Sequence, residues 1–256
     1  MNNSLELILS ELDLLKADLE IQMPLNDPAF QQILAVEYTY DSNRLENSQL
    51  TFRQTELVIG NGLLSPERPM QESMAALNHY QAIQYVIEQA NEQALLSESI
   101  MQRLHSILMQ AIDRQHAGLY RDQTSRLPWG VTLPDPEELM PLITEHIQWL
   151  RREGPFLHPI IFAAEVHQRI VCLAPFNRGN GLLARLLMNL VLLSAEYPLI
   201  NIVSTDDNRL AYYNALQQTN MSTLNPQWSN FIAGQILANF RSLLTRVSNR
   251  PINDQS

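Results

Sequence analysis

Apolar residues recur at the spacing of an α-helix along most of this chain, and glycine is scarce. In the first segment the repeat follows Leu5, Ile8, Leu9, Leu12, Leu15 and Leu19. Steps of three and four residues place these side chains on one face of a helix. Only 8 glycines occur in 256 residues, so few positions favour a break in a helix. The sequence therefore predicts an all-α fold.

Further helices are expected at 29–40, 50–59, 72–91, 97–114, 136–152, 158–172, 182–195, 207–218 and 228–247. The helical pattern stops between Gly118 and Pro136, where apolar residues alternate with turn residues, and this segment is predicted to form a small β-hairpin flap. No repeat or long linker divides the chain. We expect a helical extension at 1–34, one domain at 35–247 and a disordered tail at 248–256.

Charge and cysteine content narrow the functional class. The formal net charge of −10 and the pI near 5.0 argue against a nucleic-acid partner, because phosphate backbones are held by clustered basic residues. The single Cys172 excludes an intramolecular disulfide and fits a reducing compartment. The N-terminus lacks a signal-peptide pattern, and the longest apolar run, 182–193, is too short to span a bilayer. These features predict a cytoplasmic protein with no membrane partner.

A Gly-Asn-Gly turn at 179–181 directly precedes the apolar run. Glycines allow a sharp turn with exposed N–H groups, and the following helix directs its positive end at the same point. This arrangement is typical of a phosphate site. A second Gly-Asn-Gly, at 60–62, is followed by no long helix and is predicted to end a helix.

Two motifs in the chain resemble those of one known family. Residues 174–185, Ala-Pro-Phe-Asn-Arg-Gly-Asn-Gly-Leu-Leu-Ala-Arg, resemble the signature of Fic (Fido) domains, H-P-F-x-[D/E]-G-N-G-R-x-x-R. Ser42, Glu46 and Asn47 fit the family's inhibitory motif, [S/T]-x-x-x-E-[G/N]. Further similarities extend the match over roughly residues 35–220. The resemblance implies a Fic-type helical domain.

Fic proteins typically transfer AMP from ATP to a hydroxyl of a target protein, and the resemblance implies this chemistry. Three residues of this chain, however, depart from the family's signature. Ala174 stands in the position of the general base, Arg178 in that of the Mg²⁺ ligand, and Leu182 in that of the first arginine. We therefore predict no catalytic residue, no metal ligand and a Mg²⁺ site that is weakened or absent. The residues expected to bind ATP or phosphate are Gly179, Asn180, Gly181, Arg185 and Arg178.

The resemblance also implies that Glu46 pairs with Arg185 and hinders productive ATP binding. Two interpretations stay open, continued autoinhibition and a purely structural ion pair, and the second is favoured because a buried pair is destabilised by loss of one partner. A target protein would bind along the flap, at 126–132, by strand addition.

Three functions remain as alternatives. We favour a pseudoenzyme that retains nucleotide binding. The second is an active nucleotidyl or phosphoryl transferase with an unidentified base, and the third is a helical scaffold that forms homo-oligomers.

No metal-ligand spacing occurs among His79, His105, His116, His146, His158 and His167. We expect His167 to be a core residue.

Overall fold

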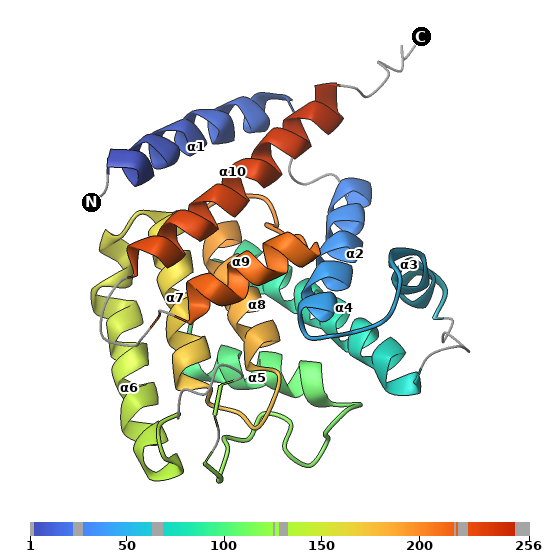
Figure 1. The fold of residues 1–256 in the computed structure, drawn as a ribbon, viewed down its shortest axis with the longest axis vertical. Helices are drawn as coiled ribbons and strands as arrows, with labels where there is room; N and C mark the ends of the chain where they lie inside the picture. The colour runs from blue at the N-terminus through green and yellow to red at the C-terminus, as the bar shows by residue number, and fades with distance from the viewer. Residues whose placement is uncertain are drawn as a thin grey trace.

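The computed structural model describes residues 3–22, 28–62, 69–124, 126–127, 133–217, 219 and 225–248. Its elements are α1 (Asn3–Gln22), α2 (Pro28–Leu45), α3 (Phe52–Asn61), α4 (Met70–Asn91), α5 (Glu98–Met109), α6 (Pro136–Arg152), the 3-10 turn η1 (Gly154–Phe156), α7 (Pro159–Leu173), α8 (Asn180–Ser194), α9 (Asp206–Leu216) and α10 (Pro226–Ser248). The predicted all-α fold is confirmed (Figure 1).

Helix α8 forms the centre of the fold and packs against α7, α4, α5 and α2. Its residues 182–192 are all buried. A helix that is apolar on all sides needs neighbours on all sides, so this segment becomes the core of the domain rather than a surface helix. The N-terminus of α8 is thereby fixed between α7, α5 and α2.

Helices α1 and α10 lie against each other along one side of the molecule (Figure 1). Arg246 of α10 also forms a two-pronged ion pair with Glu37 of α2, with distances of 3.0 and 3.1 Å. Helix α2 runs through residue 34, so the boundary expected there does not coincide with a break between helices. The tail expected at 248–256 lies, beyond Ser248, outside the described residues.

Helix ends follow the capping residues that the sequence offers. Thr51 accepts a hydrogen bond from the backbone of Gln54 and forms a capping box with it, and Ser97 caps α5. Gly62 ends α3 in the left-handed conformation, with φ of 64°. The prediction that the Gly-Asn-Gly at 60–62 ends a helix is confirmed.

The structure does not support the predicted hairpin flap in the part of 118–136 that it describes. No strand is present there, and Arg126 is the one described residue of this segment in a β-bridge. Turns and side chains hold this segment instead: Leu119 bonds His116 within a turn, and the backbone N–H of Arg121 donates to the Pro175 carbonyl at 2.9 Å. Gly and Pro signal turns as readily as hairpins. The rest of the flap, 125 and 128–132, lies outside the described residues.

None of the helices in the described part of the chain is both long and apolar enough to cross a membrane.

Candidate anion site

The loop between α7 and α8 has a residue in the left-handed conformation at each end. Ala174 ends α7 with φ of 38° and ψ of 65°, and Gly179 precedes α8 with φ of 75°. The positive φ favours glycine there, and a β-carbon at Gly179 would lie 2.6 Å from Cε of Met109, so that side chain would have to move. Ala174 tolerates a conformation that is unfavourable for residues with a side chain.

Asn180 closes this loop with its own side chain. Its Oδ1 accepts a hydrogen bond from the Phe176 N–H at 3.1 Å, and its Nδ2 donates to the Phe176 carbonyl at 2.7 Å. The amide group is thus engaged within the loop. What Asn180 offers an anion is its backbone N–H at the start of α8.

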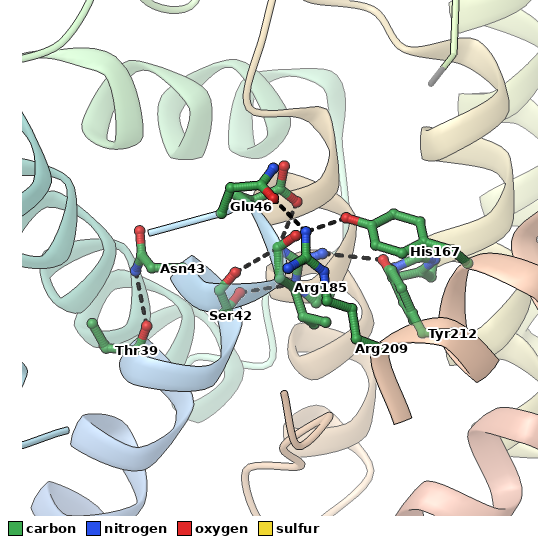
Figure 2. Close-up of polar contacts among 11 residues, drawn as sticks. Thr39, Ser42, Asn43, Glu46, His167, Arg185, Arg209 and Tyr212 are labelled. Carbon is green, nitrogen blue, oxygen red and sulfur yellow. Dashed lines mark hydrogen bonds and ion pairs between the residues drawn. The ribbon is translucent and has the colours of Figure 1, made fainter. Parts of the chain in front are cut away.

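Arg185, one turn into α8, is the charged centre of the site. Its Nε donates to Oγ of Ser42 at 2.8 Å, and its Nη1 donates to the hydroxyl of Tyr212 at 3.0 Å. Its Nη2 donates both to the Ser42 carbonyl at 3.0 Å and to Oε1 of Glu46 at 2.8 Å. Figure 2 shows these contacts converging on the guanidinium from α2 and α9.

The environment keeps this guanidinium charged although it is buried. Burial acts to lower the pKa of Arg185, but Tyr212, Glu46 and Tyr38 together hold it above its ordinary value. A buried cation is stable only when its donors are satisfied, and four hydrogen bonds provide this. The contact between Glu46 and Arg185 that the resemblance implies is present.

The two members of this ion pair differ in exposure. The side chain of Arg185 is 1% exposed and that of Glu46 is 39% exposed. Glu46 therefore borders solvent, and its own charge can be hydrated when it moves away from Arg185. The assumption of a fully buried ion pair does not hold for Glu46.

The Glu46 carboxylate lies over the first turn of α8. A β-carbon at Gly181 would lie 2.3 Å from its Oε1. The positive end of the helix and Arg185 thus face the same carboxylate. We call the N–H groups of residues 179–181 together with Arg185 the anion cradle, and a carboxylate of the chain itself now lies in it.

A turn after α2 presents Glu46 to the cradle. The Asn43 carbonyl accepts hydrogen bonds from the N–H groups of Glu46 and Ser48, both at 3.0 Å. Asn47 has φ of 72°, a conformation that asparagine tolerates better than most residues. This explains in physical terms why the motif has Gly or Asn after the glutamate.

Helices α9 and α4 fasten the same turn. The hydroxyl of Tyr213 donates to the Leu45 carbonyl at 2.7 Å, and Arg209 bonds the side-chain oxygen of Asn47. Glu72, in the first turn of α4, accepts two hydrogen bonds from the residues that follow the turn. The position of Glu46 therefore depends on three helices.

The three departures from the signature lie in different environments. Ala174 and Leu182 are buried, whereas Arg178 is exposed. His167 is a core residue as predicted: it is buried, and its Nε2 contacts the hydroxyl of Tyr212 at 3.1 Å. Burial holds the pKa of His167 well below its ordinary value. It supports Tyr212 and does not take the place of the missing base at position 174.

His105 contributes to the site in a way that the sequence analysis missed. The N–H of Gly118 donates to its Nδ1 at 2.9 Å, so Nε2 carries the proton and donates to the Arg178 carbonyl at 3.1 Å. Its ring stacks on Phe176 with centroids 3.7 Å apart. Burial lowers the pKa of His105 to about 4, which keeps the ring neutral at pH 7. From the sequence, His105 was considered only as a possible metal ligand, and no local pattern indicates these contacts.

Arg121 also holds the signature loop and was not predicted to do so. It is buried, its Nε donates to the Ala174 carbonyl at 2.8 Å, and its Nη1 donates to the Gln123 carbonyl at 3.0 Å. Its backbone N–H bonds Pro175. The backbone at the position of the general base is therefore fixed although the base itself is replaced.

Comparison with known proteins identifies the family to which this chain belongs. The model of the Fic/DOC family matches residues 95–192. A protein adenylyltransferase Fic from Nematostella vectensis is 31% identical over 194 residues, which are 74% of this chain and 44% of that protein. The chain belongs to the Fic/DOC family. It spans less than half the length of the curated Fic relatives that it matches.

Solved Fic structures share the fold over nearly the whole chain. A Fic domain containing signaling protein from Bacteroides thetaiotaomicron superposes with a TM-score of 0.84 at 24% identity, covering 97% of this chain and all of that one. Fic-1 from C. elegans gives a TM-score of 0.81 at 21% identity, covering 94% of this chain and 72% of that one. The helices that build the anion cradle thus belong to the Fic fold.

The residues present do not fit the Mg²⁺ that Fic adenylyltransferases generally use. Mg²⁺ prefers carboxylate and phosphate oxygens, and the position of the acidic ligand holds Arg178. The carboxylate at the cradle is Glu46, which Arg185 already engages. Among the described residues no cluster of three or more acidic, His or Cys side chains is arranged to hold a metal ion.

Proposed function

We propose that this Fic protein, which is related to protein adenylyltransferases, binds a nucleotide through its phosphates in the anion cradle and is a pseudoenzyme for AMP transfer. The observation that carries the proposal is Ala174. This residue is 3% exposed, and its methyl group offers no lone pair for the proton of an attacking hydroxyl. Loss of a general base typically lowers a rate by about 10²- to 10⁴-fold.

Retained parts of the site support ligand binding. The Gly179–Gly181 backbone opens α8, Arg185 is held in place by Ser42 and Tyr212, and Glu46 already lies there as an anion. A phosphate that binds the cradle competes with the Glu46 carboxylate for Arg185. Ser42, Glu46 and Asn47 therefore form an inhibitory element for binding, with Glu46 as a displaceable gate.

The expected location is the cytoplasm, because the single Cys172 suits a reducing compartment.

Calorimetric titration with ATP tests the binding. We expect Glu46→Ala to bind ATP more tightly than the unaltered protein, because the competing carboxylate is gone. Glu11→Ala is the matched control, since Glu11 also forms an exposed ion pair with an arginine, Arg241, and its loss should leave the affinity unchanged. No binding by either the unaltered protein or Glu46→Ala would overturn the proposal in favour of a scaffold.

Mass spectrometry after incubation with Mg²⁺ and ATP tests the pseudoenzyme. We expect no AMP adduct on the protein or on added lysate proteins, with or without Glu46→Ala. The triple change Ala174→His, Arg178→Asp and Leu182→Arg, in the Glu46→Ala background, should restore transfer if it folds, which circular dichroism checks. An adduct formed by the unaltered signature would establish an active transferase with another base.

A further inference from the structure

Arg178 brings a positive charge to a position where the family carries a metal ligand. It directly precedes Gly179, and its carbonyl is fixed by His105. Its side chain is exposed, and among the described residues no ion pair or hydrogen bond of its guanidinium is found. The guanidinium is therefore free to bind a ligand, and the Arg178 backbone lies one residue before the cradle.

Asp113, whose pKa is affected by Arg178, already forms a hydrogen bond with His116. The pKa of Asp113 is lowered mainly by the hydrogen bond from His116 and, to a smaller extent, by Arg178. The Asp113 carboxylate lies 2.8 Å from Nδ1 of His116. Its hydrogen bond goes to His116, and its interaction with Arg178 is electrostatic only, without a direct ion pair.

The cradle has a positive character that disfavours a divalent cation. Arg178 directly precedes it in the chain, Arg185 lies within it, and the N-terminus of α8 points at it. The anion that the chain itself places there, Glu46, is held by Arg185 and lies over Gly181. A ligand that displaces Glu46 also removes this carboxylate from the cradle.

We infer that the cradle binds the polyphosphate of its ligand as the metal-free anion, with the Arg178 guanidinium in place of the divalent cation. The inference rests on the proposed function and specifies its ligand class: di- or triphosphates that carry no bound metal. Arginine forms strong, two-pronged hydrogen bonds to phosphate oxygens, and it neutralises charge without the geometry that Mg²⁺ demands.

Titration with ATP in the Glu46→Ala background, in excess EDTA and in excess Mg²⁺, tests the inference. We expect binding about tenfold tighter in EDTA, the worth of one charge-assisted hydrogen bond. Adding Arg178→Asp should reverse the preference. Arg241→Asp is the charge-matched control, because Arg241 is exposed on α10, and it should keep the preference for the metal-free form.

The outcomes separate the inference from the proposed function. Equal or tighter binding with Mg²⁺ by the protein with Arg178 would overturn the inference and leave nucleotide binding intact. No binding in either buffer would overturn the proposed function and the inference with it. Inorganic tripolyphosphate should displace ATP whereas adenosine should not. Displacement by adenosine alone would show that the base, not the phosphate chain, is bound, and would also overturn the inference.

Discussion

The carboxylate of Glu46 and the α-carbon of Gly181 lie so close that no β-carbon fits between them. Oε1 of Glu46 would be 2.3 Å from a β-carbon at position 181, and Nη1 of Arg185 would be 3.2 Å from it. Glycine at this position therefore allows the chain to place its own anion at the positive end of α8. The contact of Glu46 with Arg185, 139 residues away in sequence, thus depends on the absence of a methyl group at position 181.

Gly181→Ala should expel Glu46 from the cradle. We expect loss of the exposed ion pair to lower the free energy of unfolding by about 1 kcal/mol or less, since the carboxylate can move into water. Urea unfolding of Gly181→Ala, Glu46→Ala and the double variant measures the coupling. Strictly additive effects would show that the two residues do not interact.

Arg185 and Glu46 should contribute unequally to stability. Arg185→Met leaves Ser42 and Tyr212 without their shared buried donor and should cost about 3–5 kcal/mol. Glu46→Ala should cost about 1 kcal/mol or less, because the carboxylate is largely screened by solvent. Urea unfolding of both variants provides the comparison, and equal losses would contradict the contact pattern.

His105 should position the signature loop through its two ring nitrogens. His105→Phe preserves an aromatic ring against Phe176 but loses the bonds to Gly118 and to the Arg178 carbonyl, which should cost about 2–3 kcal/mol. His105→Ala should cost more, since the stack is lost as well. Chemical unfolding gives the stability, and ATP titration shows whether the cradle is disturbed. Identical costs for Phe and Ala would argue against the stacking contact.

Acid should destabilise the fold well above the range of ordinary carboxylates. Burial lowers the pKa of His79 and of His146 to about 3 and that of His105 to about 4, from 6.5. The unfolded chain therefore binds more protons than the folded one between about pH 4 and 6.5. The free energy of unfolding should have its full value above pH 6.5. Below pH 6.5 it should decrease by about 1.4 kcal/mol per pH unit for each histidine. Urea unfolding at pH 7 and pH 5 measures the loss.

His146→Leu isolates one histidine of this set. Neither ring nitrogen of His146 has a hydrogen-bond partner in the described residues, so an apolar side chain should be tolerated at pH 7. The difference in stability between pH 7 and pH 5 should shrink by about 2 kcal/mol, the share of one histidine over 1.5 pH units. An unchanged difference would show that His146 does not contribute to the acid sensitivity.

Local sequence signals determined the helices and the cradle's backbone. The period of apolar residues, the caps at Thr51 and Ser97, and the glycines at 62 and 179 act over three or four residues. Such interactions are readable from the sequence because both partners are close along the chain. The absence of a base at position 174 is likewise a fact of the sequence alone.

Tertiary packing decided how the cradle is occupied and held. Glu46 reaches Arg185 across 139 positions, and Tyr212 and Ser42 complete the contacts of that arginine. His105 and Arg121 fix the loop through backbone carbonyls, which every residue possesses and no sequence pattern marks. The predicted hairpin is not supported in its described part for a related reason: whether a segment rich in Gly and Pro pairs as strands depends on the surface against which it folds. Long-range contacts, not local propensity, place an anion of the chain in its own phosphate cradle.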